Sequence, residues 1–340
     1  DRIRASLAAG PSLPGMTRDE VPVELLINVE NPGDVLPDRL DGLAGVGLYR
    51  TEFIYMNRPF FPSEDEQLAV YQQVLKRSGG REVVFRTIDV GGDKPLPYFR
   101  VDREDNPALG WRGFRISDQW PDLFIAQMRA LLRASAYGNV KIMLPMVSTV
   151  EEVRRAQAIV QDLKSDLKRR GTPIAPKVPV GVMVEVPAAA IAIEALLREA
   201  DFVSIGSNDL IQYLMAVDRN NARVAPLYQE LNPSVLKVIA NVIRAANRVG
   251  KEVSLCGEMA GNFYCTLVLL GLGLRRFSMA RHYLTGVGRL LRAVSIDEAE
   301  AAARRALNFY TTGEVKAFLG ARTRDIFLSI GVPIEESDLE

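Results

Sequence analysis

Short apolar runs alternate with longer amphipathic segments through most of the chain. Eight of these runs have the length of a single strand and are rich in Val, Ile, Leu, Met and Phe. Continuous apolar runs of this kind are typical of parallel strands that are buried on both faces. We therefore predict strands at 24–28, 46–50, 82–90, 141–146, 180–185, 202–206, 252–258 and 275–279.

Helical patterns occupy the segments between these runs. In the clearest of them, 149–170, the apolar residues Val153, Ala156 and Val160 fall on one face. The predicted helices lie near 33–42, 64–78, 121–135, 149–170, 187–198, 233–249, 262–270 and 280–294. Eight strand–helix units in succession indicate an α/β fold, a (β/α)8 TIM barrel with parallel strands.

Two insertions interrupt this repeat. Residues 91–118 are rich in Gly and Pro and follow the third strand, and residues 218–232 follow the sixth. Both insertions come after the carboxyl end of a strand, where barrel enzymes place their active-site loops.

The chain divides on this pattern into three parts. Residues 1–20 are interpreted as a linker and the remnant of a helix from an N-terminal domain that precedes the barrel. Residues 21–295 form the predicted barrel. Residues 296–340 form a C-terminal extension, with helices expected at 297–310 and 312–329 and an acidic tail.

Composition narrows the class of protein. The 42 basic and 42 acidic residues give a formal net charge of zero, which excludes bulk electrostatic attraction to nucleic acid or anionic lipid. The two cysteines, Cys256 and Cys265, fit neither a zinc knuckle nor a redox pair and indicate a reducing compartment. We see no leader and no apolar run of the ~20 residues that a membrane span needs, so we expect a cytoplasmic protein.

Polar residues follow two of the predicted strands directly. Glu185 closes the fifth strand, Asn208 and Asp209 close the sixth, and Arg219 lies in the insertion after it. Two carboxylates at the ends of neighbouring parallel strands suit Mg²⁺, and an arginine nearby would hold an anionic substrate. Alternatively, Glu185 and Asp209 only cap the helices that follow them. This stretch alone leaves the two interpretations equally open.

The remaining strand ends favour the binding site. They supply Arg50, Arg86, Cys256 and Glu258, and the first insertion supplies Arg112. Each residue has an ordinary structural explanation by itself, since surface arginines and buried cysteines are common. Together, at one end of a barrel, four arginines with carboxylates and a thiol indicate a site for a phosphorylated anion and a metal.

Several motifs resemble the C-terminal, phosphoenolpyruvate-binding domain of Enzyme I of the bacterial phosphotransferase system. The resemblance covers roughly residues 20–295. The motifs are GLYRTEF (47–53), FRTIDVGGDKPLPYF (85–99), NPALGWRGFRI (106–116), GVMVEVPAAA (181–190), SIGSNDLIQYLMAVDRNN (204–221) and LCGEMAG (255–261). Pyruvate, phosphate dikinase and phosphoenolpyruvate synthase share the Arg-Thr-Glu and Cys-Gly-Glu elements. The residues that flank these elements here resemble Enzyme I more than those two enzymes.

The resemblance implies a role for each site residue. It implies that Glu185 and Asp209 bind Mg²⁺ and that Cys256 protonates the enolpyruvate left after phosphoryl transfer. It also implies substrate contacts from Asp209 and from five further residues, Arg50, Arg86, Arg112, Asn208 and Arg219. Arg50 and Arg86 would in addition stabilise the phosphoryl group during its transfer, so we count them as catalytic. The role of Glu258 stays open.

The resemblance also implies partners. In the family the phosphoryl group passes to a histidine on a separate N-terminal domain and then to a small phosphocarrier protein, and the barrel domain forms a homodimer. The single histidine, His282, lies in MARHYLTG, which does not match the family's phosphohistidine motif. We therefore expect this chain to bind substrate and metal but to complete no transfer alone.

Two further hypotheses stay open at this point. A Mg²⁺-dependent lyase acting through a pyruvate enolate would also use Glu185 and Asp209, although it leaves four arginines and Cys256 unexplained. A non-catalytic sensor of phosphoenolpyruvate would not need the proton donor. The choice between a sugar pathway and a nitrogen-related pathway is open as well.

Overall fold

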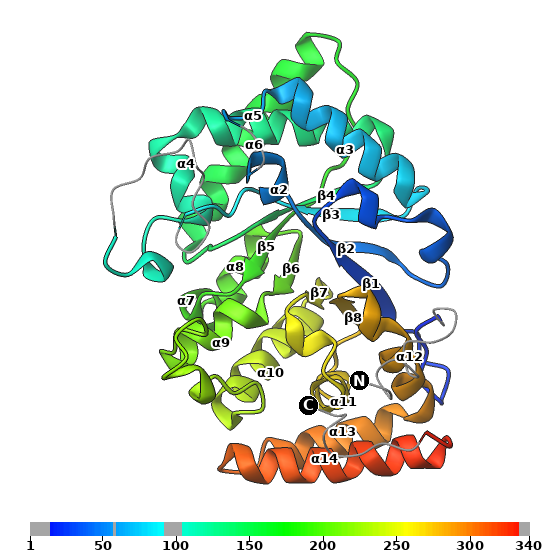
Figure 1. Cartoon of the computed structure of the whole chain (residues 1–340). Coiled ribbons are helices and arrows are strands. Elements are labelled where there is room, and N and C mark those ends of the chain that lie inside the picture. The colour runs from blue at the N-terminus through cyan, green and yellow to red at the C-terminus, as the bar shows by residue number, and fades with distance from the viewer. Residues whose placement is uncertain (1–13, 57–58, 92–103, 333–340) are drawn as a thin grey trace. The chain divides into compact units, whose positions relative to one another are not determined.

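The computed structural model describes residues 14–56, 59–91 and 104–332. Eight strands close into a barrel in the order of the sequence, which confirms the predicted fold class (Figure 1). The strands are β1 Glu24–Val29, β2 Gly45–Arg50, β3 Glu82–Arg86, β4 Val140–Leu144, β5 Val180–Val184, β6 Phe202–Ile205, β7 Glu252–Leu255 and β8 Arg276–Met279. Each lies at a predicted position.

Helices follow most of the strands. The longer ones are α3 Glu64–Ser78, α5 Pro121–Ala134, α6 Val150–Arg169, α8 Ile193–Glu199, α9 Ser207–Met215, α10 Pro233–Arg248, α11 Phe263–Gly271, α12 Leu284–Ala293, α13 Ile296–Ala306 and α14 Thr312–Ser329. Shorter ones are α2 Glu52–Met56, α4 Ile116–Gln119 and α7 Pro187–Ile191. Both helices expected in the C-terminal extension are present.

Several predicted elements differ from the structure. The helix predicted at 33–42 is wrong, because this segment forms only the two 3-10 turns Pro32–Asp34 and Pro37–Arg39. A proline opens each turn and, lacking an N–H, cannot continue a helix beyond its first turn. The strands predicted at 82–90 and 252–258 end earlier, at Arg86 and Leu255.

Two compact units make up the chain. Unit 1 contains the described parts of 1–28, 38–47 and 205–340, and unit 2 contains 29–37 and the described parts of 48–204. The predicted domain boundaries at residues 20 and 295 remain predictions. Residues 1–13, 92–103 and 333–340 lie outside the described residues, and with them most of the predicted linker, the GGDKPLPYF motif and the acidic tail.

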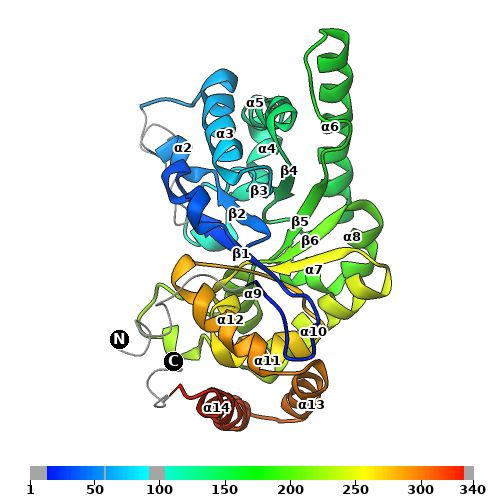
Figure 2. The ribbon, with the colours of Figure 1, turned by 90° about the vertical axis from the view of Figure 1, so that its right-hand side faces the viewer.

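In unit 2, β3, β4 and β5 pair in parallel. Helices α3 and α5 lie side by side next to them in both views (Figures 1 and 2). Helix α6 begins at a reciprocal capping box, in which the Thr149 hydroxyl accepts from the N–H of Glu152 and the Glu152 carboxylate accepts from the N–H of Thr149. The cap explains why the helix starts where the sequence predicts.

In unit 1, the strand pairs β7–β8 and β8–β1 are parallel. Helices α13 and α14 lie beside α11 in both views (Figures 1 and 2). A Cβ on Gly271 would lie 1.9 Å from the carbonyl oxygen of Ala299, so α11 and α13 meet at a position where only glycine fits. The C-terminal extension is therefore packed on unit 1.

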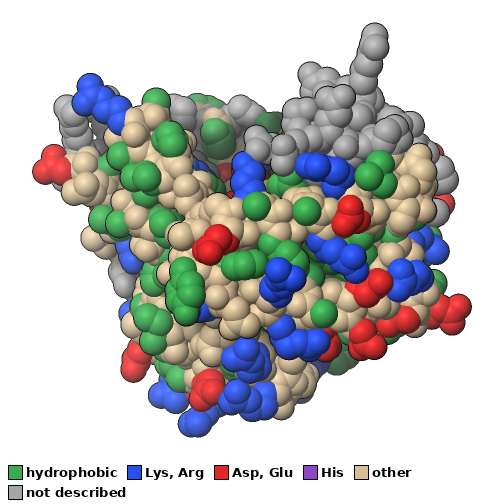
Figure 3. Space-filling view, turned by 90° about the horizontal axis from the view of Figure 1, so that it is seen from below, with side chains coloured by type: hydrophobic (Ala, Val, Ile, Leu, Met, Phe, Trp, Pro, Cys, Tyr) green, Lys and Arg blue, Asp and Glu red, His purple; other side chains and the backbone are tan. Residues whose placement is uncertain are grey.

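The face shown in Figure 3 carries lysine and arginine side chains as well as aspartate and glutamate side chains. Within the described residues, no helix combines the length and the apolar character that crossing a membrane requires.

Candidate active site

Three predicted arginines in unit 2 follow strand ends. Arg50 is the last residue of β2, Arg86 is the last residue of β3, and Arg112 precedes the 3-10 turn Gly113–Arg115. An isolated bridge between Gly91 and Arg112 returns the first insertion to the end of β3. Arg50 and Arg86 therefore stand at strand ends, and the bridge brings Arg112 back to the segment that follows β3.

Arg86 and Arg112 belong to a buried ion-pair network. Nη2 of Arg86 lies 2.7 Å from Oε1 of Glu52, and its Nη1 lies 3.2 Å from Oδ2 of Asp89. Nη2 and Nε of Arg112 lie 3.0 and 3.3 Å from the two carboxylate oxygens of Asp89. The exposed fractions are 5% for Arg86, 2% for Arg112 and 0% for Asp89. Asp89 thus bridges two buried arginines and fixes the planes of both.

Neutral polar groups hold the backbone next to this network. The Thr51 hydroxyl donates to the carbonyl of Arg86, and Gln127 accepts from the N–H of Ile88 while its amide donates to Thr51. Gln127 and Thr51 are both buried. Arg86 and Asp89 are therefore presented by a segment that is tied on both sides.

Glu185 also lies in unit 2, directly after β5, and is 1% exposed. Its Oε1 accepts from the N–H of Met146 at 2.7 Å. Met146 has φ +57°, and a Cβ on Gly113 would lie 2.8 Å from the Cβ of Met146. This close approach connects the Glu185 carboxylate to the segment that carries Arg112.

Unit 1 holds the other predicted residues. Helix α9 starts two residues after β6, so Asn208 and Asp209 occupy its first turn, where the helix dipole favours a carboxylate. Asp209 is 6% exposed, and Nη2 of Arg219 lies 3.8 Å from its Oδ1. Asn208 and Glu258 exchange two hydrogen bonds, from Nδ2 to Oε1 at 3.1 Å and from the Glu258 N–H to Oδ1 at 2.9 Å. Glu258 therefore orients Asn208.

Cys256 follows β7 and is 3% exposed. Its Sγ lies 3.7 Å from the carbonyl oxygen of Ile205, and the carbonyl oxygen of Cys256 accepts from Nδ2 of Asn28. The next residue, Gly257, would place a Cβ only 1.9 Å from Oγ of Ser207. The turn that carries the thiol is thus packed directly against the start of α9.

His282 lies in the exposed 3-10 turn Arg281–Tyr283, with its ring 3.9 Å from that of Tyr283. Among the described residues, no hydrogen bond joins His282 to the candidate site residues. The interpretation that His282 has no role in phosphoryl transfer stays a prediction.

Sequence reasoning missed Glu30, Glu52 and Asp89 as partners of the arginines. Glu52 is the acid of the Arg-Thr-Glu motif, and Asp89 stands three residues after Arg86. An acid close in sequence to a buried strand-end arginine is the signal that could have identified both, because a buried charge needs a partner.

Each unit contributes one buried carboxylate, Glu185 or Asp209, that could bind a metal. Carboxylate oxygens are the ligands that Mg²⁺ prefers, and Mg²⁺ uses only one or two of them besides water and phosphate. Among the described residues, no group of three or more His, Cys, Asp and Glu side chains could hold a metal ion. The donor chemistry of each carboxylate, taken by itself, fits Mg²⁺.

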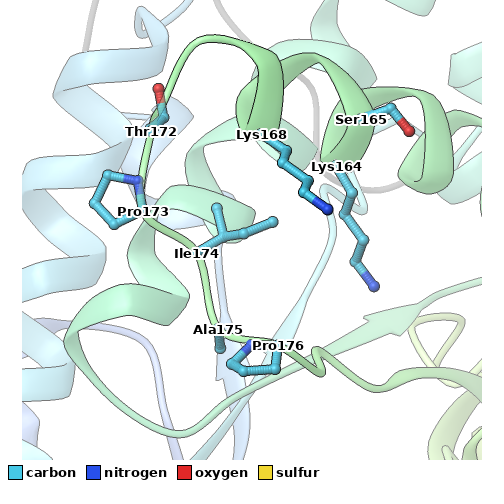
Figure 4. Close-up of a pocket in the computed structure, with 8 residues that line it drawn as sticks. All are labelled: Lys164, Ser165, Lys168, Thr172, Pro173, Ile174, Ala175 and Pro176. Atoms are coloured by element: carbon cyan, nitrogen blue, oxygen red, sulfur yellow. The ribbon is translucent and has the colours of Figure 1, made fainter.

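A pocket of about 480 Å³ lies elsewhere in unit 2. Lys164 and Lys168 extend from the last turns of α6 over the segment 172–176 (Figure 4). This segment precedes β5, so the pocket lies at the opposite end of that strand from Glu185. The described residues that line it include no carboxylate for a cation, and none of them is a predicted site residue.

A half-buried acid with no predicted role, Glu230, lies in unit 1 beside Asn262 and Cys265. The Oε2 of Glu230 accepts from Nδ2 of Asn262 at 2.9 Å and from Sγ of Cys265 at 3.6 Å. Burial raises the pKa of the Glu230 carboxyl, and the charge of Glu258 adds to this. Burial and the same carboxylate also raise the pKa of the Cys265 thiol.

We expect the substitution Glu230→Gln to change how stability depends on pH. The folded state holds the Glu230 proton more tightly than the unfolded state, so this group stabilises the fold at acid pH and loses that contribution as pH rises through its raised pKa. The variant should therefore gain stability relative to the natural protein as pH rises above 4.5, the ordinary pKa of a glutamate. Urea unfolding of both proteins across this range measures the difference, and a constant difference would contradict the assignment.

Comparison with known proteins places the chain. Residues 4–296 match the family model described as PEP-utilising enzyme, PEP-binding domain. The chain is 47% identical to the phosphoenolpyruvate-protein phosphotransferase of Geobacillus stearothermophilus over 304 residues, which are 89% of this chain and 53% of that protein. It is 46% identical to the protein of the same name from Bacillus subtilis (strain 168) over 306 residues, 90% of this chain and 54% of that one. The chain spans about half the length of the curated relatives it matches.

A solved citrate lyase from Burkholderia xenovorans covers 63% of this chain and 72% of its own, with 16% identity and a TM-score of 0.39, a likeness too weak to carry an argument. The family match covers most of the described barrel. This chain belongs to the family of PEP-utilising enzymes and contains their PEP-binding domain.

Proposed function

We propose that the chain is the phosphoenolpyruvate-binding catalytic domain of a phosphoenolpyruvate-protein phosphotransferase. The observation that carries this proposal is the pair of buried arginines beyond the end of β3, Arg86 and Arg112, which share the buried carboxylate of Asp89, in a chain that belongs to this family. Arginine suits a phosphorylated ligand because its five N–H donors can hold a carboxylate and a phosphate together. A pyruvate-enolate lyase needs no such pair, and the curated relatives are named as phosphotransferases.

Each residue has a role in this proposal. Arg50, Arg86 and Arg219 bind the phosphoryl group and stabilise the charge that develops on it, with Arg112 close to Arg86 through Asp89. Asn208, oriented by Glu258, fixes the substrate at the start of α9. The residues that would hold Mg²⁺ are Glu185 and Asp209. When bound, the metal neutralises phosphate and carboxylate charge.

The proposal includes the path of the phosphoryl group and the source of the proton. The bond between phosphorus and the enol oxygen breaks, and a bond from phosphorus to a histidine nitrogen forms. The enolate that remains takes a proton at its methylene carbon from the Cys256 thiol and becomes pyruvate. The buried position of Cys256, directly after β7, suits a thiol that must deliver a proton away from bulk water.

The partners belong to the proposal as well. The acceptor is a histidine on a separate N-terminal domain, since His282 lies in an exposed turn without the matching motif, and a small phosphocarrier protein receives the group next. We propose a homodimer, in keeping with the family. A cytoplasmic location accords with the two free cysteines, Cys256 and Cys265.

Calorimetric titration of phosphoenolpyruvate into this chain, with and without Mg²⁺, tests the proposal. We expect binding that requires the metal and that is lost in Glu185→Ala and in Arg86→Ala. Lys164→Ala, in the pocket beside α6, is the control and should bind as the natural chain does. Absence of binding by the natural chain under both conditions would overturn the proposal.

A further inference from the structure

Among the three predicted arginines of unit 2, Arg50 has a different kind of partner from Arg86 and Arg112. Nη1 of Arg50 lies 2.5 Å from Oε1 of Glu30. The side chains of both residues reach solvent, with exposed fractions of 39% for Arg50 and 54% for Glu30. Glu30 directly follows β1, and Arg50 ends β2. This ion pair therefore lies at a strand end and is open to an incoming ligand.

The buried pairs cannot exchange partners in the same way. Releasing Glu52 or Asp89 from Arg86 would take a guanidinium partner away from a carboxylate that is at most 6% exposed. Such a charge is costly because water cannot replace the lost partner. Glu30 can turn into solvent when it leaves Arg50, since an exposed ion pair is worth little. Of these three predicted arginines, Arg50 is thus the one that can exchange a protein carboxylate for an anionic ligand.

The backbone around Glu30 is held, so only its side chain needs to move. The preceding residue, Val29, is the last of β1. On the other side, the N–H of Asn31 donates to Oδ2 of Asp34 at 3.0 Å, and the N–H of Val35 donates to the carbonyl of Pro32 at 3.3 Å. Side-chain rotation of Glu30 therefore breaks neither the strand nor the turn.

We propose that Glu30 is an exchangeable counter-ion of Arg50, which competes with the substrate's anionic group for this guanidinium and lowers the affinity of the site. The inference rests on the proposed function, because it assumes that Arg50 contacts phosphoenolpyruvate. Glu30 pairs with Arg50 when substrate is absent, turns into solvent when the anion arrives, and returns as the anion leaves. It is a residue that sets affinity and not a catalytic one.

Two variants of Glu30 test the proposal by calorimetric titration of phosphoenolpyruvate with Mg²⁺. Glu30→Gln removes the competing charge and should tighten binding by about two- to five-fold, as expected for an exposed ion pair. Glu30→Asp keeps the charge but shortens the side chain by one methylene, which lengthens and weakens its contact with Arg50. We expect the affinity of Glu30→Asp to lie between those of the natural chain and Glu30→Gln.

The control variant is Glu199→Gln, which removes a carboxylate from an exposed ion pair with Arg154. It should leave affinity unchanged. If Glu30→Asp binds like the natural chain while Glu30→Gln binds more tightly, only net charge matters and competition at Arg50 is ruled out. Unchanged or weaker binding in both variants also overturns the inference, whereas a natural chain that binds no phosphoenolpyruvate overturns the proposed function instead.

Discussion

The substitution Asp89→Asn is expected to lower the free energy of unfolding by about 3–5 kcal/mol, the usual cost of breaking a buried ion pair from one side. Asp89 is fully buried and contacts both Arg86 and Arg112. Asparagine has nearly the same shape but carries no charge. It would remove the carboxylate charge that Arg86 and Arg112 share.

Urea unfolding followed by circular dichroism measures this effect. The matched control is Asp65→Asn, the same substitution in an ion pair with Arg133, where the aspartate side chain is 81% exposed. Surface pairs contribute little, so the control should lose less than about 1 kcal/mol. Equal losses in the two variants would mean that the network at Asp89 is not a buried one in solution.

Asp89→Asn also separates positioning from charge at the site. The variant keeps both arginines, so bulk attraction of an anion is not weakened. If Asp89 acts by fixing the guanidinium planes, the folded variant, measured without urea, should bind phosphoenolpyruvate at least ten-fold more weakly than the natural chain. The reason is that bidentate arginine contacts depend on geometry. Affinity equal to or above that of the natural chain would show that Asp89 serves stability alone.

The fold could be predicted from the sequence because its signals are local. The periodicity of apolar residues located every strand, and the boundaries of α3 and α14 agree with the prediction because a Ser63–Glu66 and a Thr311–Glu314 capping box mark their starts. The helix predicted at 33–42 is wrong for a local reason as well. Prolines open 3-10 turns here, and the spacing of apolar residues alone did not distinguish these turns from a helix.

Candidate site residues could be proposed from the sequence, but the pairings of their side chains could not. Strand ends identified Arg50, Arg86 and Glu185, since a parallel barrel brings the carboxyl ends of its strands to one face. Which acid neutralises which arginine depends on side-chain contacts across segments, such as Arg112 with Asp89, and periodicity contains no information about these. The sequence therefore predicted a cluster of positive charge, whereas Arg86 and Arg112 are largely neutralised.

The turn after β7 provides the second large expected effect. We expect Gly257→Ala to lower phosphoenolpyruvate affinity at least ten-fold and the free energy of unfolding by about 1–3 kcal/mol, the usual cost of overpacking. The backbone of Gly257, at φ −80° and ψ −179°, is open to alanine. The obstacle is steric, because the new Cβ would lie 1.9 Å from Oγ of Ser207 and 2.8 Å from the N of Ser207.

A displaced turn would change the site in two ways. The hydrogen bonds between Asn208 and Glu258 would break, and Cys256, next to the new methyl group, would shift from the end of β7. Removing the nearest atom with Ser207→Ala should restore only part of the affinity, because the backbone N of residue 207 still blocks the methyl group. Full rescue would show that the side chain alone is the obstacle.

The matched control is Gly313→Ala in α14, where an added Cβ has nothing within 4 Å. Alanine favours a helix over glycine by about 1 kcal/mol, so this variant should bind as the natural chain does and unfold no more easily. Calorimetry and urea unfolding of the three variants give both quantities. If Gly257→Ala matches Gly313→Ala in affinity, the close approach of the Cys256 turn to α9 does not control the site.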